Sequence, residues 1–206
     1  MESRAAAAAA QSHRRRPWRR ALTAMASASA SIVVRVAAAA DIPAITAIYA
    51  RHVESGTASF ELEAPGIDEI KRRYAAAQAS SYPYLVACDT EGKVIGYAYA
   101  GPYRARPAYR HTVENSVYVE AGGSGRGIGS ALLAVLIAAC AERGFRQMIA
   151  IIGGAENAAS IALHRAHGFV EVGRLADVGR KHERWLDTVL MQRALGDGGK
   201  SPPTRK

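Results

Sequence analysis

The chain has 206 residues, a hydrophobic share of 49% and a formal net charge of +9. This length suits one domain with a substantial core, and the longest apolar run, residues 131–141, is too short to cross a membrane. The basic excess lies mainly at the ends, because residues 31–193 carry 18 basic and 16 acidic side chains, and this balance argues against a nucleic-acid-binding core.

Residues 1–30 are rich in Ala, Arg and Ser and show no periodic apolar face, which predicts a disordered arm. Three interpretations compete for it: an organellar transit peptide, a nucleic-acid-binding arm in which Trp18 stands among Arg residues, and a translation start at Met25 instead of Met1. We favour the start at Met25, because it stands just ahead of the first predicted strand. Mass spectrometry of the native amino terminus separates the three.

Strands and helices alternate from residue 31 onward. The pattern predicts strands at 31–36, 84–88, 93–101, 111–120, 147–152, 169–173 and 185–192. It predicts helices at 41–54, 66–78, 127–143 and 156–167, the first capped by Asp41 and the last ended by Gly168. Residues 89–92 form a hairpin turn. These elements predict one α/β (α+β) domain over residues 31–193, with helices flanking a mixed central sheet, followed by a disordered tail at 194–206.

Two cysteines, Cys88 and Cys140, each stand among apolar neighbours. This environment predicts buried free thiols in a reducing compartment, which favours a cytoplasmic location. The spacing of Cys and His residues does not suggest a metal site.

The stretch "NSVYVEAGGSGRGIGS" at 115–130 joins a predicted strand to a long apolar helix through five glycines. A phosphate-binding P-loop is excluded, because no lysine lies between Lys93 and Lys181. A dinucleotide fingerprint fits weakly, because its third glycine position falls on Ser130 or Ile128. A pyrophosphate-binding turn fits better, since consecutive N–H groups and the helix dipole attract phosphate. A merely flexible loop is disfavoured by the apolar helical stripe that begins at Ile128.

The segments "RGIGSALL" and "ENAASIALHRAHGFVEVGR" resemble the GNAT acetyltransferases. Within that family, "GYAYAGPYRARPAYRHTVENSVYV" and "VGRKHERWLDTVLMQ" resemble the phosphinothricin (methionine sulfoximine) N-acetyltransferases, and the resemblance runs from about Ile32 to Gln192. It implies the GNAT fold, acetyl-CoA as cofactor, a homodimer, and acetyl transfer to a small amino-acid analogue such as phosphinothricin, methionine sulfoximine or methionine sulfone. The alternatives are an acetyltransferase for protein amino termini or lysines, and an acyl-CoA-binding regulatory module.

The resemblance also places the cofactor along the chain. Its pyrophosphate is expected on the 122–129 turn and its pantetheine arm along the strand backbone near 117–119. The expected contacts are Val117, Tyr118, Val119, Ser124, Gly125, Arg126, Gly127, Ile128, Gly129, Ser130, Asn157 and Ser160. Ser124 departs from the family motif, which has Arg or Gln there. A side-chain contact with phosphate is shortened or lost, while the backbone donors remain.

Acetyl transfer to an amine requires a base and a proton donor for the departing thiolate. Strand alternation places Thr112, Glu114, Ser116 and Tyr118 on one face, so Glu114 is a candidate base and the resemblance gives it that role. The alternative is a structural glutamate held in an ion pair.

Asn157, Ser160 and His164 share one face of the 156–167 helix. The resemblance places His164 where many GNAT enzymes have Tyr, so His164 is a candidate thiolate acid, with Tyr118 as the alternative acid. A packing role for His164 and a helix-start hydrogen bond for Asn157 are the competing interpretations.

The segment from Tyr103 to Tyr109 contains two arginines and two tyrosines between strands, and Pro102 and Pro107 stiffen the turn. Arginine forks bind carboxylate or phosphinate groups bidentately, which suits an acceptor with a second anionic end; a solvated basic loop is the alternative. The resemblance makes Phe60 an aromatic wall of the acceptor pocket near a subunit interface, although it also fits a core position. The expected acceptor contacts are Phe60, Arg104, Arg106, Tyr109, Glu114 and Ser116.

Overall fold

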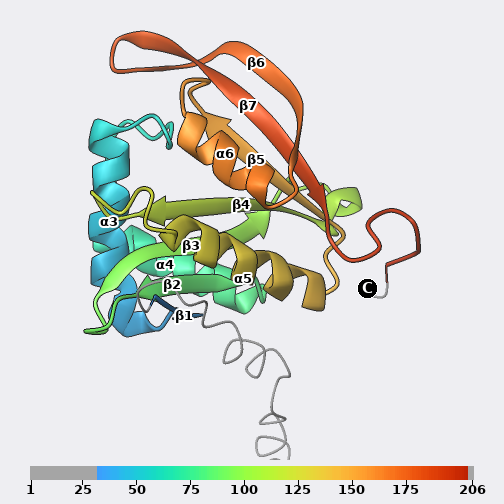
Figure 1. Ribbon diagram of the computed structural model, residues 1–206, viewed down its shortest axis with the longest axis horizontal. Coiled ribbons are helices and arrows are strands. Elements are labelled where there is room, and N and C mark those ends of the chain that lie inside the picture. Colours follow the sequence, from blue (N-terminus) through green and yellow to red (C-terminus); the bar gives the residue numbers. More distant parts are fainter. Residues whose placement is uncertain (1–31, 204–206) are drawn as a thin grey trace, which may run out of the picture.

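A seven-stranded mixed sheet in the order β1-β2-β3-β4-β5-β7-β6 forms the centre of the computed structural model, which describes residues 32–203 (Figure 1). The strands are β1 Val33–Val36, β2 Tyr84–Cys88, β3 Val94–Pro102, β4 Thr112–Val119, β5 Gln147–Gly153, β6 Val170–Lys181 and β7 Arg184–Ala194. The helices are α3 Ile42–Ser55, α4 Ile67–Ala79, α5 Ile128–Glu142 and α6 Ala158–Ala166, with 3-10 turns η1 Ala39–Asp41 and η2 Pro107–Tyr109. The predicted mixed sheet with flanking helices is confirmed. The predicted arm at 1–30 lies outside the described residues.

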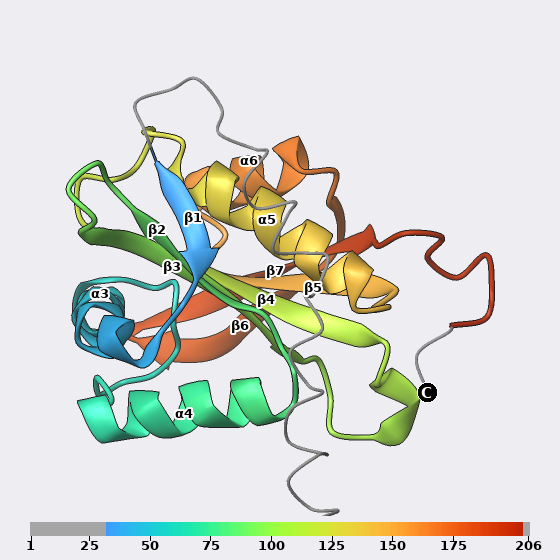
Figure 2. The same cartoon turned by 90° about the horizontal axis from the view of Figure 1, so that it is seen from below.

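The sheet separates two hydrophobic cores. Helices α3 and α4 cover one face, and α5 and α6 cover the other (Figure 2). Helix α5 is the most completely buried, because Leu132, Leu133 and Leu136 are inaccessible to solvent. Both cysteines are buried free thiols as predicted, Cys88 in the α3/α4 core and Cys140 in the α5/α6 core. No helix among residues 32–203 is long and apolar enough to cross a membrane.

Strands β4 and β5 form the only parallel pair among the strands described, and their pairing is short. The register joins Thr112–Asn115 to Gln147–Ala150. Beyond this point β4 stays paired with β3 as far as Val119, and β5 stays paired with β7 as far as Gly153. The two strands therefore diverge and open a gap in the middle of the sheet (Figure 1), as expected at the predicted pantetheine position.

Asp41 occupies the N-cap position of α3 as predicted, but its side chain does not form a cap hydrogen bond with the helix. The η1 turn precedes the helix, and the Asp41 carboxylate accepts hydrogen bonds from the Arg35 guanidinium at 2.6 and 2.7 Å and from the Ala38 amide at 2.7 Å. The hydrogen bond from Arg35 lowers the pKa of Asp41 below its usual value. The carboxylate thus ties η1 to the end of β1 instead of satisfying the first turn of α3.

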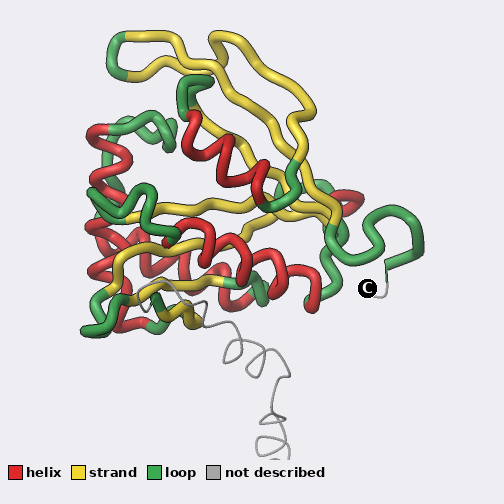
Figure 3. The backbone as a smooth tube through the Cα atoms, viewed as in Figure 1, coloured by secondary structure: helices red, strands yellow, loops and turns green. Residues whose placement is uncertain are grey.

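The carboxyl-terminal hairpin is much longer than predicted. Strand β6 runs through to Lys181, where the sequence pattern predicts only 169–173, and the hairpin projects beyond the rest of the sheet (Figure 3). The register of β6 shifts between Glu171 and Gly173 and again between Leu175 and Gly179, and these irregularities interrupt the period-2 pattern that identifies strands in sequence.

The described part of the tail, for which the sequence predicts disorder, contacts the domain through Arg146. Arg146 donates hydrogen bonds to the Ser201 hydroxyl at 3.0 Å and to the Pro202 carbonyl at 2.8 Å, and it lies 3.5 Å from the Asp197 carboxylate. Leu195 is buried. These contacts hold residues 195–202 in turns beside the start of β5. The sequence of the tail has no periodic pattern from which these turns could be predicted.

Candidate active site

The gap between β4 and β5 is lined by four parts of the chain. A small cavity of about 50 Å³ lies there, lined by residues of β4, β5, α6 and the α3–α4 loop: Ala58, Asn115, Ser116, Val117, Tyr118, Ala150, Ile151, Ile152, Gly153, Asn157, Ser160 and His164. Beyond Asn115, the backbone of β4 has no strand partner on its β5 side within the described chain. This arrangement fits the extended, amide-bearing pantetheine arm, which pairs with backbone groups as a strand does.

The glycine turn forms a cradle of main-chain amides. Gly122, Gly125 and Gly127 have φ values of +75°, +77° and +80°, a left-handed conformation that glycine adopts without strain. The space where a Cβ would stand on each is open. Within the described residues, the amides of Ile128, Gly129 and Ser130 in the first turn of α5 have no protein acceptor, as at any unfilled helix amino end. The turn therefore fits a diphosphate.

Fewer main-chain amides of the glycine turn are free than the sequence suggests, because two of them bond within the turn. The Gly123 amide bonds to the Glu120 carbonyl at 3.0 Å, and the Arg126 amide bonds to the Gly123 carbonyl at 3.4 Å. The Arg126 side chain is exposed and lies 3.9 Å from the Glu120 carboxylate, and Ser124 is exposed. The Ser130 hydroxyl lies 2.8 Å from His167 Nε2, which joins the two helices of this face.

Glu114 lies on the α3/α4 face of β4, as strand alternation predicts. It stands opposite Gly101 of β3, and Ser116 stands opposite Tyr99. Burial raises the pKa of Glu114 above its usual value, and the positive charge of Arg104 opposes the shift. A carboxylate whose pKa moves toward neutrality is suited to accept a proton from an amine.

Tyr118 extends from the same face of β4 into a group of aromatic rings. Its ring centroid lies 5.1 Å from that of Tyr49, 5.2 Å from Tyr97 and 5.3 Å from His52. Burial raises the pKa of Tyr118 well above its usual value, so the phenol keeps its proton at neutral pH. The His52 ring also contacts the Val119 carbonyl at 2.8 Å, which fixes the end of β4 against α3.

His164 is buried, with both ring nitrogens in polar contacts. Its Nδ1 lies 2.8 Å from the Ser160 carbonyl, and its Nε2 lies 3.0 Å from Asn115 Oδ1. The Asn115 amide donates in turn to the Ile149 carbonyl at 3.1 Å. Burial lowers the pKa of His164 below its usual value, and a neutral ring can donate a hydrogen bond to only one of the Ser160 and Asn115 oxygens. The contacts join α6 to both diverging strands.

Asn157 forms the helix-start hydrogen bond, one of the two roles expected for it. Its side-chain carbonyl accepts from the Ser160 amide at 3.2 Å and so caps α6. The same side chain lines the gap between the strands, so capping and contact with a ligand in that gap are compatible.

The arginines of the β3–β4 connection are solvent-exposed. The Arg104 guanidinium lies 5.1 Å from the centre of the Tyr103 ring, and Tyr103 packs edge-on against Tyr109 at 5.7 Å. Arg106 precedes the η2 turn. Within residues 32–203, neither arginine forms an ion pair with a carboxylate. Arg104 still acts on Glu114 through its charge, which places an uncompensated positive charge near the candidate base.

Phe60 occupies a slot between two glycines of different strands. A Cβ on Gly153 would lie 2.7 Å from the Phe60 ring, and a Cβ on Gly179 would lie 2.2 Å from it. The buried Lys181 ammonium donates to the neighbouring Ser59 carbonyl at 2.8 Å. The ring therefore fastens the α3–α4 loop to the hairpin and is 39% exposed, so it is not a core residue. The glycines were not recognisable as partners from the sequence.

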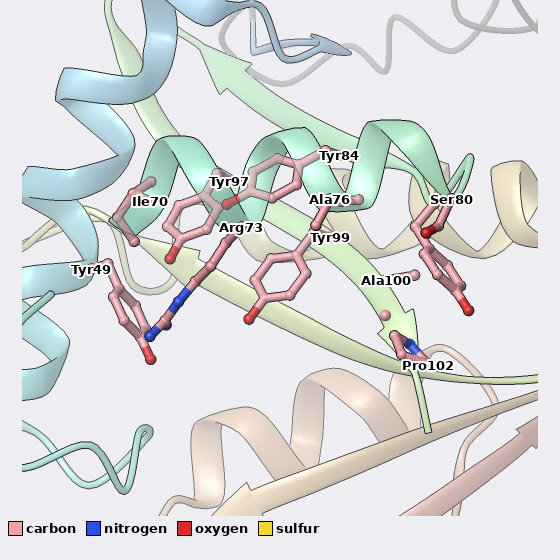
Figure 4. A pocket seen from close by; sticks show the side chains of 13 residues that line it. Tyr49, Ile70, Arg73, Ala76, Ser80, Tyr84, Tyr97, Tyr99, Ala100 and Pro102 are labelled. Atoms are coloured by element: carbon pink, nitrogen blue, oxygen red, sulfur yellow. The ribbon is translucent and has the colours of Figure 1, made fainter. Parts of the chain in front are cut away.

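A second hollow on the α3/α4 face was not predicted. This groove of about 340 Å³ runs between α4 and β3 and is lined by Tyr49, Ile70, Arg73, Ala76, Ala77, Ser80, Tyr82, Tyr84, Tyr97, Tyr99, Ala100, Gly101 and Pro102 (Figure 4). We call it the tyrosine groove. The alternation of Tyr97 and Tyr99 in β3 was the one signal in the sequence, since it places both rings on one face.

A hydrogen-bond chain crosses one end of the tyrosine groove. The Tyr49 hydroxyl lies 2.9 Å from the Ser59 hydroxyl and donates to the Glu61 carboxylate at 3.0 Å. Arg73 donates to the same Glu61 oxygen at 2.7 Å and to Glu69 at 2.6 Å. These contacts connect the α3–α4 loop to both helices and leave the Arg73 charge balanced by two carboxylates.

Comparisons with known proteins agree with this geometry. The family model described as "Acetyltransferase (GNAT) domain" matches residues 34–190. A phosphinothricin N-acetyltransferase of Alcaligenes faecalis is 50% identical over 85% of this chain and 89% of its own. An L-methionine sulfoximine/L-methionine sulfone acetyltransferase of Pseudomonas paraeruginosa is 42% identical over 84% of this chain and 99% of its own.

Solved structures give the same result. A GNAT superfamily phosphinothricin acetyltransferase from Sinorhizobium meliloti, determined in complex with AcCoA, superimposes with a TM-score of 0.82 at 49% identity, covering 84% of this chain and 93% of its own. The diverging strands and the glycine turn thus belong to a fold shared along nearly the whole described chain. The chain belongs to the GNAT acetyltransferase family.

Proposed function

We propose that this chain transfers the acetyl group of acetyl-CoA to the amino group of a small amino-acid analogue of the phosphinothricin or methionine sulfoximine type. Membership of the family makes it an acetyl-CoA-dependent N-acetyltransferase. The names of the similar proteins support the acceptor class. The observation that carries the proposal is the gap between β4 and β5, which has free α5 amides at one end and begins, at the other, just beyond the half-buried Glu114 on β4.

Acetyl-CoA supplies an activated acetyl thioester. The reaction joins the acceptor nitrogen to the acetyl carbonyl carbon and breaks the carbon–sulfur bond, so the acceptor ammonium loses a proton and the coenzyme sulfur gains one. Glu114 takes the proton from the ammonium, directly or through a water. The α5 amides and the unpaired backbone of β4 hold the donor, with Asn157 and Ser160 beside it. Arg104 attracts the anionic end of the acceptor.

Two side chains are candidates for returning a proton to the sulfur, and we assign this step to Tyr118. Its phenol is protonated at neutral pH, whereas His164, whose pKa is lowered by burial and whose ring contacts Ser160 and Asn115, is a positioning residue. Tyr118→Phe is expected to lower kcat by about 100-fold with little change in Tm. His164→Gln is expected to lower Tm by about 3 °C or more with a smaller effect on kcat. The opposite pattern in kinetics and thermal unfolding would exchange the two roles.

A thiol-release assay tests the acceptor class. The purified full chain is given acetyl-CoA with methionine sulfone, methionine sulfoximine, phosphinothricin, glutamate or a short peptide. Fastest release is expected with the first three, because Arg104 and Arg106 suit a compact acceptor with a second polar or anionic end. Thiol release with the peptide and with no other acceptor would show that the enzyme acetylates protein amino termini instead. Unchanged basal release with every acceptor would remove the proposal.

We propose further that the enzyme is a cytoplasmic homodimer. Exposed apolar side chains on the hairpin support a second copy as the partner: Val170, Val172, Leu175, Val178 and Trp185. The two buried free thiols support a reducing compartment. Sedimentation equilibrium is expected to give twice the chain mass, and a monomer at micromolar concentration would contradict the dimer.

A further inference from the structure

The tyrosine groove has the dimensions of a ligand site. Its volume of about 340 Å³ falls within the range of about 300–1,000 Å³ that is usual for small-molecule sites. It follows α4 from Ile70 to Ser80, a rise of about 15 Å along the helix axis. A small polar acceptor would leave most of such a groove unfilled. The length of the groove therefore favours an acceptor with a longer side chain.

The groove opens beside the candidate base. Gly101 lines the groove and stands opposite Glu114 in the β3–β4 register, so both lie on the same face of the sheet. Gly101 has no side chain, and the space where its Cβ would stand is open. Tyr99, the next residue of β3 on this face, lines the groove and stands opposite Ser116. An amine placed at Glu114 therefore has direct access to the groove for the rest of its molecule.

The walls of the groove favour a neutral aromatic group. Tyr84 and Tyr99 stack with ring centroids 5.0 Å apart and an interplanar angle of 11°, and Tyr97 lies parallel to Tyr99 at 6.2 Å (Figure 4). Aromatic rings gain from such offset stacking in addition to apolar burial. Arg73, the one charged side chain lining the groove, is already paired with Glu61 and Glu69. The groove therefore holds no uncompensated charge that would favour an anionic side chain.

We propose that the tyrosine groove receives the acceptor's side chain, and that this enzyme acetylates amino acids with a large neutral aromatic side chain, such as phenylalanine, in addition to the small polar analogues. The inference rests on the proposed function, because it uses Glu114 as the site of the amine. It assigns the choice of acceptor side chain to β3 and α4, which the reaction chemistry itself does not involve.

Ala76 offers a way to fill the groove without disturbing a core. It is exposed, lies on α4 and lines the groove, whereas the neighbouring Ala75 is exposed and does not line it. Ala76→Trp is expected to lower kcat/KM for phenylalanine at least tenfold and for methionine sulfone less than threefold. Ala75→Trp is the matched control, and it is expected to leave both values unchanged. Calorimetric binding of N-acetylphenylalanine to the wild-type chain, weakened at least tenfold in Ala76→Trp, provides a readout independent of turnover.

The outcomes separate this inference from the proposed function. Thiol release with methionine sulfone or phosphinothricin but with no aromatic amino acid would overturn the inference and leave the proposed function standing. Equal losses for phenylalanine and methionine sulfone in Ala76→Trp would also overturn it, because the groove would then not distinguish side chains. Binding of N-acetylphenylalanine that Ala76→Trp leaves unchanged would place the aromatic group elsewhere. Absence of release with any acceptor would overturn both.

Discussion

Glu114→Gln is expected to lower kcat by about 10²- to 10⁴-fold, the usual contribution of general acid–base catalysis. The amide keeps the shape and the β4 position of the carboxylate but cannot accept a proton from the acceptor ammonium. Acetyl-CoA affinity, measured by calorimetry, is expected to stay unchanged, because the Glu114 side chain is not among the residues that line the strand gap or the free amides of α5. An unchanged kcat at neutral pH would remove the assignment.

The pH profile gives a second measure of the same residue. The pKa of Glu114 is raised by burial, so the base form is present above the raised pKa and is lost as pH falls through it. The wild-type kcat is expected to rise with pH across that interval, and the residual rate of Glu114→Gln is expected to lack the inflection. Glu171→Gln, at an exposed glutamate of β6, is the matched control and is expected to keep both the rate and the inflection.

Gly153→Ala is expected to lower the free energy of unfolding by about 1–3 kcal/mol, the usual range for overpacking. The added methyl would stand 2.3 Å from the Thr57 carbonyl and 2.7 Å from the Phe60 ring, and the first of these is backbone. The α3–α4 loop must move, and it carries Ser59 and Glu61 of the hydrogen-bond chain. The KM for the acceptor is therefore expected to rise while the affinity for acetyl-CoA changes less.

Gly173→Ala in β6 controls for the general effect of adding a methyl to a strand glycine. Its Cβ would meet nothing within 4 Å, so its stability in urea is expected to stay close to the wild-type value. Equal stability of the two variants would show that the α3–α4 loop moves without loss of folding free energy. The account of the Phe60 slot would then be wrong.

The parts of the fold that the sequence predicted well depend on local chemistry. Strand β2 at 84–88 has the predicted bounds, and the glycine turn has positive φ at three of its glycines. The alternation that placed Glu114 beside Ser116 is local too, because strand geometry sends every second side chain to the same face. The positions of residues that depend only on their neighbours in the sequence were therefore predicted correctly.

The parts that were missed depend on tertiary contacts. Phe60 meets Gly153 and Gly179 across separations of more than ninety residues, and no local pattern marks that meeting. The tyrosine groove assembles rings from α3, β2 and β3 against α4. The Asp41 carboxylate accepts from Arg35, six positions earlier, and not from the amides of the helix that it precedes. A local propensity was overridden in each case by a partner from another element.

The division of the interior into two cores has an evolutionary consequence. Helices α5 and α6 cover the face of the sheet opposite to Glu114, whereas α3 and α4 cover the face that carries Glu114 and the tyrosine groove, and the strands lie between the two groups of buried side chains. Under the function proposed above, substitutions that reshape the α4 surface can change which acceptor is acetylated without disturbing the opposite face. A lineage of such enzymes can diversify its substrates by mutation on one half of the molecule while the other half stays under unchanged selection.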